Sequence, residues 1–327
     1  MRDSNAACPE PVSAATGPRR NLVFARVGQA SVHPYWLAEP AAERNWDLQL
    51  STWMPDLAGL TDGDFPVHVD PGVKWGCIGR FFVEHPELLD RYDYVLFPDD
   101  DLLFDAGSIS RIFTICREHD LKIAQPALRL SSYAFHCLLF ECPAFRLRYT
   151  NFVEPMGPVI STEHLRTLLP YFGRWQTGWG LDHFWTLMMR DPRWAAAIID
   201  SEPMLHIRPL QTGGIYTSFR RLGLDPLRDM AEIQANFTNV PQGKIVCGSV
   251  LRDGRRLGRT GTNLLGGLHL LRVASAAREP ERVRRAGLGM IARIVTKVGY
   301  RPATATFRSG GDLQVHDALH SRTHPLS

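Results

Sequence analysis

Residues Tyr92–Leu102 read YDYVLFPDDDL, an apolar segment followed by three consecutive aspartates. The apolar half, Tyr92–Phe97, has the composition of a buried β-strand. Asp99, Asp100 and Asp101 follow it directly, and adjacent carboxylates repel one another unless a cation or solvent relieves the repulsion. The stretch therefore predicts a strand with an acidic loop at its carboxyl end.

Short apolar segments alternate with segments of helical spacing on both sides of this stretch. The expected strands are Asn21–Val27, Trp46–Trp53, Phe65–Val69, Ile123–Ala127, Val159–Ile160 and Ala195–Ile199. The expected helices are Gly76–His85, Ser108–His119 and Leu181–Met189, with a further helix that begins near Thr162. Ser108 and Thr162 are the expected N-caps. This alternation predicts an α/β fold with a mostly parallel, mixed sheet flanked by helices.

The composition is that of a globular protein, since 44% of the 327 residues are apolar and 22% are charged. We expect a disordered leader over residues 1–20, one compact α/β domain over 21–247, a basic helical region over 248–302 and a disordered tail over 303–327. Within the basic region, Glu281–Val298 is amphipathic. It is expected to pack on the α/β domain, and a helix that lies on a membrane surface is the alternative.

Charge is distributed unevenly along the chain. Residues 251–327 contain 14 Lys and Arg against 5 Asp and Glu, a net charge of +9. Because the whole chain carries +3, residues 1–250 carry −6. A basic C-terminal region favours peripheral contact with an acidic membrane surface, or is a solvated tail without a partner. We expect no nucleic-acid partner.

Six cysteines are scattered without a C-x-x-C pair, which argues against a structural zinc site or a thioredoxin-like motif. No segment contains the roughly 18 consecutive apolar residues of a transmembrane helix. The polar N-terminus (MRDSNAACPEP) lacks the apolar core of a signal peptide. These features predict a cytoplasmic protein with reduced thiols that contacts a membrane at most peripherally.

The aspartates have the spacing and the position of a metal site. Ligands of an open α/β sheet bind at the carboxyl ends of its strands. Asp99 and Asp101, separated by one residue, can hold Mg²⁺ or Mn²⁺ against a diphosphate, and the ion neutralises a phosphate leaving group. The alternative for so short a motif is an Asp-rich turn that caps the following helix.

Two later segments carry further candidates. Gly178–Asp182 (GWGLD) places two glycines around a tryptophan, as in loops where the backbone closely approaches a ligand or another segment. Asp182 is then either a general base for a hydroxyl or a carboxylate that interacts with the dipole of the next helix. His206 ends Ile198–His206 (IIDSEPMLH) and can complete an ion site with Asp101, although a lone histidine is more often an ordinary core or surface residue.

Lys74 and Arg80 lie on the segment before the aspartate-bearing strand, where they can meet a pyrophosphate or remain routine surface charges. With Asp99, Asp100 and Asp101 they form the expected binding set for a diphosphate. Other chemistries lack their motifs. The chain contains no G-x-G-x-x-G at the first helix, no G-x-x-x-x-G-K-[ST] loop, no G-x-S-x-G and no H-E-x-x-H.

Six segments in order resemble a family of unknown function from plants and bacteria, whose plant members often carry the label "lysine-ketoglutarate reductase trans-splicing related". They are Val73–Phe81 (VKWGCIGRF), Tyr92–Leu102, Ile123–Leu128 (IAQPAL), Phe152–Ser161 (FVEPMGPVIS), Gly178–Asp182 and Ile199–His206 (IDSEPMLH), and Gly213-Gly214 closes the series. The resemblance covers about three-fifths of the chain. This family is similar in turn to glycosyltransferases of the GT-A fold.

The resemblance implies roles for individual residues. Asp99 and Asp101 match the D-x-D motif of GT-A enzymes, which binds the metal and the nucleotide-sugar diphosphate. Asp182 matches the acidic residue after a Trp-Gly step, which serves as catalytic base in inverting members of that fold. His206 matches a late histidine that can be a further metal ligand.

On the acceptor side, the resemblance implies contacts from Glu154 and Trp179. This chain departs from the plant pattern at Arg129, where relatives show an acidic residue, and at Gly76, where they show an aromatic residue. Plant members usually carry an upstream membrane anchor, and we expect none here. These departures concern the acceptor and the location more than the metal site.

Together these features predict a metal-dependent glycosyltransferase that uses Mn²⁺ or Mg²⁺. It would move a sugar from a nucleotide-diphosphate donor to a hydroxyl of a carbohydrate or other acceptor, with inversion if Asp182 is the base. Two alternatives stay open. Another metal-dependent phosphoryl or nucleotidyl transferase would turn over a nucleotide without transferring its sugar. A catalytically inactive carbohydrate-binding relative would bind sugar even after chelation.

Overall fold

The computed structural model describes residues 18–189, 191–210, 215–238, 240, 243–302 and 304. The expected disordered leader and tail lie almost entirely outside these residues, as do Cys8 and Gly213-Gly214.

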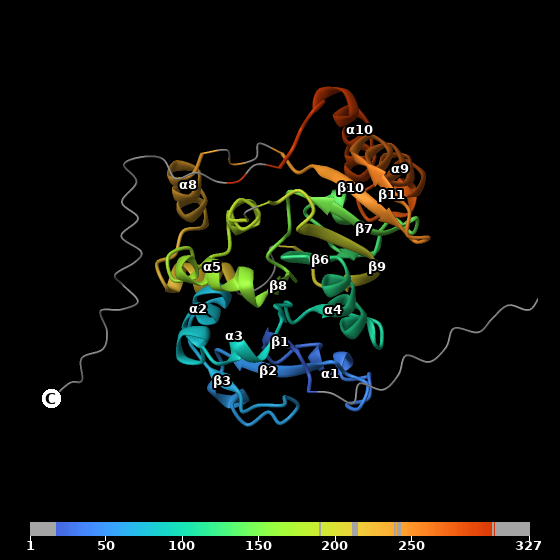
Figure 1. The fold of residues 1–327 in the computed structure, drawn as a ribbon. Helices are drawn as coiled ribbons and strands as arrows, with labels where there is room; N and C mark the ends of the chain where they lie inside the picture. Colours follow the sequence, from blue (N-terminus) through green and yellow to red (C-terminus); the bar gives the residue numbers. More distant parts are fainter. Residues whose placement is uncertain are drawn as a thin grey trace, which may run out of the picture.

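One mixed sheet forms the centre of the molecule (Figure 1). Its order is β11-β10-β7-β9-β6-β8-β4-β1-β2-β3, and β5 pairs with β9 outside this path. The strands are β1 Asn21–Arg26, β2 Trp46–Thr52, β3 His68–Val69, β4 Tyr94–Leu96, β5 Leu102–Leu103, β6 Ile123–Leu128, β7 Phe145–Thr150, β8 Val159–Ser161, β9 Ala196–His206, β10 Val246–Leu251 and β11 Arg256–Gly258.

The helices flank this sheet, which confirms the predicted α/β class. They are α1 His33–Trp36, α2 Lys74–Glu84, α3 Leu88–Arg91, α4 Ser108–Glu118, α5 Thr162–Phe172, α6 Leu181–Phe184, α7 Ile215–Arg221, α8 Pro226–Asn236, α9 Arg259–Val273 and α10 Pro280–Thr296. Short 3-10 helices span Pro55–Leu57, Cys137–Leu139 and Ala274–Ala276.

The strand directions bring two predicted site segments to one edge of the sheet. Strands β3, β2, β1 and β4 pair in parallel, and so do β6 and β9, whereas β8 runs antiparallel between β4 and β6. Strands β7, β10 and β11 extend the sheet by antiparallel pairing. Because β4, β6 and β9 share one direction, the carboxyl ends of β4 and β9 lie at the same edge.

Both faces of the sheet are buried, as the alternation along β1 shows. Leu22 and Phe24 belong to a core cluster that includes apolar side chains of α2, α5 and α8. Val23 and Ala25 point to the other face and join a cluster with side chains of α4, α9 and α10. Successive side chains of a strand point to opposite faces, so a strand covered on both sides reads as one continuous apolar run.

The C-terminal region is part of the same sheet, which corrects the predicted division at residues 247 and 248. That division falls inside β10, which pairs with β7. Helices α9 and α10 pack beside β10 and β11 and contribute Leu270 and Met290 to the core (Figure 1). The two helices approach closely, because a Cβ on Gly267 would lie 2.8 Å from the Gly287 carbonyl oxygen.

Helix α10 matches the amphipathic segment of the sequence and packs on its parent domain, the arrangement that the sequence favoured. Within the described residues, no helix combines the length and the apolar character needed to span a bilayer.

Three local expectations were wrong. Ser108 is the first residue of α4, and the cap position belongs to Gly107 with a φ of 73°. Ser161 caps α5 by accepting a hydrogen bond from the His164 backbone, whereas the Thr162 hydroxyl donates to the Tyr92 carbonyl. The helix expected over Leu181–Met189 is α-helical only over α6, Leu181–Phe184.

Candidate functional site

A cavity of about 520 Å³ opens at the edge of the sheet where β4 and β9 end. This volume lies within the usual range of small-molecule sites, roughly 300–1,000 Å³. Its walls include most of the predicted site residues, namely Lys74, Asp99, Asp101, Glu154, Trp179, Asp182 and His206. Asp100 and Arg80 are not among the residues that line it.

The segment between β7 and β8 carries Glu154 back to this edge. The Asp99 backbone N–H donates to the Met156 carbonyl over 2.8 Å, and that of Phe97 donates to the Pro158 carbonyl over 2.9 Å. These bonds continue the β4–β8 pairing beyond the strands and fix the Glu154 segment against the aspartate loop. Residues 57 and 61 positions apart thus form one wall because the sheet topology brings them together.

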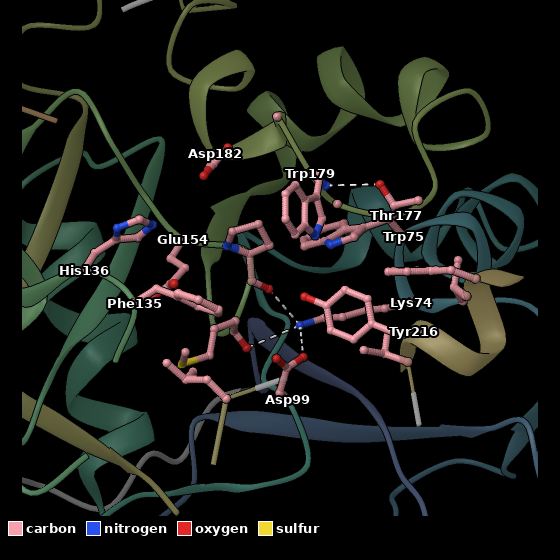
Figure 2. A pocket seen from close by; sticks show the side chains of 18 of the residues that line it. Lys74, Trp75, Asp99, Phe135, His136, Glu154, Thr177, Trp179, Asp182 and Tyr216 are labelled. Carbon is pink, nitrogen blue, oxygen red and sulfur yellow. Dashed lines mark hydrogen bonds and ion pairs between the residues drawn. The ribbon is translucent and has the colours of Figure 1, made fainter. Parts of the chain in front are cut away.

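Lys74 is an internal ion-pair partner in this structure. Its Nζ lies 2.7 Å from Oδ1 of Asp99 and donates to the carbonyl oxygens of Pro155 and Met156 over 2.9 and 3.3 Å (Figure 2). It also lies 2.8 Å from the Phe97 carbonyl oxygen. A lysine ammonium has three hydrogens, so protein groups engage all of them in this structure, and the expected contact of Lys74 with a pyrophosphate stays a prediction.

Asp101 and His206 form the second pair at this edge. His206 Nε2 lies 3.2 Å from Oδ2 of Asp101, and its Nδ1 lies 2.8 Å from the Tyr133 carbonyl oxygen. Only a protonated Nδ1 can donate to that carbonyl, so a neutral ring would turn the Nε2 lone pair toward a carboxylate. A proton or a cation between the two groups relieves this repulsion.

The surroundings of this pair favour positive charge. Burial opposes the charged form of His206, but the hydrogen bond that it donates to Asp101 and the negative charge of that carboxylate raise the pKa of the imidazole. The second oxygen of Asp101, Oδ1, is buried and has no hydrogen-bond partner within the described residues. An unpartnered buried carboxylate oxygen beside an oriented imidazole fits a divalent ion, since buried polar groups otherwise find partners.

The predicted set of three metal ligands is only partly assembled. The ligand atoms of Asp99, Asp101 and His206 do not all lie within 4.8 Å of one another. The reason is Lys74, which holds the Asp99 carboxylate while leaving the side chain 44% exposed.

Among the described residues, the possible metal-ligand atoms of a different group of side chains do lie within 4.8 Å of one another. His68, Asp70 and Cys77 lie together, and none of them lines the cavity. Arg80 pairs with both oxygens of Asp70, over 2.7 and 2.8 Å. A guanidinium thus already neutralises this carboxylate, and the group is an ion-paired cluster. Arg80, which was expected to contact a pyrophosphate, contacts Asp70 in this structure.

Asp100 does not line the cavity, but its carboxylate accepts hydrogen bonds from two groups beside it. Its Oδ2 accepts a hydrogen bond from the Gly28 backbone over 2.8 Å, and its Oδ1 accepts one from Arg208 over 2.8 Å. Arg208 itself lines the cavity. It is a cation that the sequence analysis missed, because only the end of β9 brings it beside the aspartate loop.

Glu154 and Asp182 lie on the opposite side of the cavity from Lys74 (Figure 2). Each has one buried oxygen without a hydrogen-bond partner within the described residues, Oε2 of Glu154 and Oδ1 of Asp182. Burial, together with the charge of Asp182, raises the pKa of Glu154 to about 8. Burial also raises the pKa of Asp182. Two carboxyl groups with raised pKa values can exchange protons with a bound hydroxyl near neutral pH.

Aromatic side chains form a further wall. Trp179 is 36% exposed and lines the cavity with Tyr216 of α7 (Figure 2). Gly178 and Gly180 on either side have φ values of 85° and 88°. A Cβ on Gly178 would lie 2.7 Å from the Trp75 ring, so the expected close approach of backbone to another segment is confirmed.

Several lining residues were not predicted. Phe135, His136 and Lys244 line the cavity on the Glu154 side, and Tyr216 lies opposite. Lys244 sits in the connection that leads to β10, beyond the last predicted motif. No local pattern marks these residues, since Phe135, His136 and Lys244 lie in loops and Tyr216 lies on α7, and only the fold brings them to the cavity.

A family profile described as "Protein of unknown function (DUF707)" matches residues 60–141, which contain Lys74 and the three aspartates. No curated protein matches the chain. The crystal structure of A197 from STIV is similar at 11% identity, with 73% of this chain and 93% of that chain covered and a TM-score of 0.32. The crystal structure of S. aureus TarS 1-349 in complex with UDP-GlcNAc is similar at 10% identity, with 84% and 81% covered and a TM-score of 0.37.

Proposed function

We propose that this protein is a metal-dependent glycosyltransferase that moves a sugar from a nucleotide-diphosphate donor to an acceptor hydroxyl. One observation carries the proposal. A single cavity at the carboxyl edge of the sheet has the Asp101–His206 pair on one side and the buried carboxyl groups of Glu154 and Asp182 on another. The first side suits a cation and a diphosphate, and the second suits the proton of a hydroxyl.

The donor would bind at the aspartate loop. Asp101 and His206 would hold Mn²⁺ or Mg²⁺, and Asp99 would join them if it exchanged its bond with Lys74. When bound, such an ion neutralises the charge that develops on a departing nucleoside diphosphate. The unpartnered Oδ1 of Asp101 and the Nε2 of His206 that faces it support this assignment. Arg208, which lines the same cavity, would add positive charge beside the phosphates.

The acceptor would bind against Glu154 and Asp182. Asp182 would take the proton from the acceptor hydroxyl, since a carboxylate with a raised pKa is a stronger base. Glu154, with its pKa near 8, stays protonated at neutral pH and would donate a hydrogen bond to the acceptor. Direct attack by the deprotonated hydroxyl on the anomeric carbon would invert its configuration, as the resemblance to inverting GT-A enzymes also implies.

The aromatic wall supports a sugar ligand. Trp179 and Tyr216 line the cavity from different segments of the chain. Aromatic faces bury the apolar side of a sugar ring or stack on a nucleobase. Half-exposed aromatic side chains of this kind lose hydration when a ligand covers them, which favours binding.

The proposal is tested by following product formation. The protein is incubated with Mn²⁺, a panel of nucleotide sugars and simple glycosides, and proton NMR identifies the products. We expect transfer of the sugar with inverted anomeric configuration, dependent on metal and abolished by Asp101→Asn. Release of nucleotide or phosphate without any sugar transfer would instead assign a phosphoryl or nucleotidyl transferase.

A matched control is the exposed aspartate nearest to the loop. Asp105 pairs with Arg129 and does not line the cavity, so Asp105→Asn should leave transfer unchanged. Loss of transfer in both variants would point to damage to the loop and would remove the support for a metal at Asp101.

A further inference from the structure

A second groove opens next to the cavity, with a volume of about 560 Å³. Phe135, His136 and Lys244 line both hollows. The groove therefore adjoins the Glu154 and Asp182 side of the cavity, and its lining includes none of the residues of the aspartate loop.

The groove is lined by cations. Lys244, Arg282, Arg285 and Arg293 border it, and its lining contains no aspartate or glutamate. Three of these cations come from α10, together with the small residues Ala286 and Gly289. The spacing of 282, 285, 289 and 293 places them on one face of the helix. Small side chains between the arginines leave the space that the groove occupies.

Most of this positive charge has no acidic partner within the described residues. Lys244 forms no salt bridge there; its Nζ lies over the Phe152 ring at 4.5 Å, and the acidic charges that act on it are those of Asp182 and Glu154 in the adjoining cavity. Arg285 donates only to the backbone carbonyl of Glu281, over 3.3 Å. Arg282 is the exception, because it pairs with Glu279 over 2.6 Å.

Burial disfavours the charged forms of two of these cations. It lowers the pKa of Lys244, although the charges of Asp182 and Glu154 oppose this shift. Burial also lowers the pKa of Arg293. Partly buried cations without counter-charges are unfavourable unless a ligand or solvent compensates them. A bound anion would remove this penalty.

We propose that this groove binds a phosphate or carboxylate group of the acceptor substrate, so that the acceptor is an anionic molecule. The inference rests on the proposed function, because it places the acceptor hydroxyl at Asp182. Lys244 lines both the groove and the cavity that contains Asp182 and Glu154, so the groove adjoins the proposed base. An acceptor would thus lie across Lys244, with its anionic group among the arginines of α10.

The test compares neutral and anionic versions of one sugar by calorimetry. Glucose, glucose 6-phosphate and glucuronate are titrated in EDTA, so that no divalent ion contributes to phosphate binding. We expect both anionic sugars to bind more tightly than glucose. The double variant Arg285→Gln and Arg293→Gln should weaken their binding at least about tenfold, because it removes two charge-assisted contacts. The phosphate and carboxylate arms identify which anion the groove prefers.

Arg284→Gln is the matched control. Arg284 lies on the same helix, pairs with Glu281 and does not line the groove. Equal binding of glucose and the anionic sugars, absence of binding by all three, or equal weakening by Arg284→Gln would overturn the inference. Circular dichroism of each variant confirms that the fold is retained.

Asp101→Asn separates this inference from the proposed function. It should abolish metal-dependent donor binding and leave the anionic sugars bound in EDTA. If nucleotide sugars bind with metal but the anionic sugars do not bind, only the acceptor inference fails. If the anionic sugars bind at the arginines but no nucleotide sugar binds, the proposed function fails and the groove is a simple anion site.

Discussion

The two sides of the cavity differ in how their charges are compensated. On the aspartate-loop side, Asp99 pairs with Lys74 and Asp101 with His206. On the other side, neither Glu154 nor Asp182 forms a salt bridge with any of the described residues, and each has a buried oxygen without a hydrogen-bond partner among them. The ion pairs of the aspartate-loop side stabilise the fold, and a bound metal ion would replace Lys74 or a proton as the partner of these carboxylates. Glu154 and Asp182 have no such partners and their pKa values are raised. A raised carboxyl pKa suits proton transfer to and from a substrate near neutral pH.

The largest effect should come from the uncompensated side. Asp182→Asn removes the proposed base and should lower kcat by roughly 10²–10⁴-fold, the usual contribution of general-base catalysis. Donor affinity should stay unchanged, because Asp182 lies away from the aspartate loop. Steady-state kinetics and a donor titration measure the two effects separately.

Asp191→Asn is the control for this variant, since Asp191 pairs with Arg193 on the surface. If Asp182→Asn weakens donor binding as much as it lowers kcat, the two sides of the cavity do not have the separate roles described here.

The next effect concerns the compensated side. Lys74→Met leaves Asp99 and two carbonyl oxygens without their donor and should destabilise the fold by about 2 kcal/mol, less than a fully buried pair because Asp99 is partly exposed. Denaturant unfolding measures the change. Lys122→Met is the comparison, because its partners Asp120 and Glu163 are exposed, and the loss should stay below about 1 kcal/mol. Equal losses would mean that Lys74 does not hold the aspartate loop.

An effect of comparable size should depend on pH. The pKa of Glu154 is raised to about 8 in the folded protein, so folding favours its protonated form and stability falls as pH rises from about 4.5 to 8. Glu154→Gln removes this penalty. The variant should gain stability over the wild type progressively through that window, by roughly 2–4 kcal/mol at pH 8 and constantly above it. Thermal unfolding at several pH values that shows a constant difference would place Glu154 in a solvated site.

The smallest effect is a shift in one titration. Asp101→Asn removes the charge that raises the pKa of His206, so the pKa of the imidazole should fall. NMR titration in EDTA observes this directly. An unchanged pKa would mean that Asp101 and His206 are not a pair in solution.

The aspartate-loop side could be predicted because local patterns encode it. An apolar strand followed by acidic residues, and a second strand that ends in His206, meet wherever the two strands run in the same direction. The partner of Lys74 could not be predicted in this way. Its contact with Asp99 depends on where α2 begins relative to β4, which no local spacing determines.

On the Glu154 and Asp182 side, several residues that line the cavity could not be predicted from sequence patterns. Lys244 and His136 have no motif, and they reach Glu154 only through loops that the sheet order positions. The division expected at residue 247 was wrong for a related reason. Strand β10 reads VCGSVL, a weak apolar pattern, and becomes a strand because β7 offers it a pairing partner. Tertiary pairing of this kind overrides local propensity.

The most direct test of the donor site is a calorimetric titration of the protein with nucleotide sugars, first with Mn²⁺ and then with EDTA, for the wild type and for Asp101→Asn. The site geometry predicts that at least one nucleotide sugar binds only with metal, and that Asp101→Asn abolishes this binding. A folded wild type that binds no nucleotide sugar under either condition would contradict the assignment of the cavity to a glycosyltransferase.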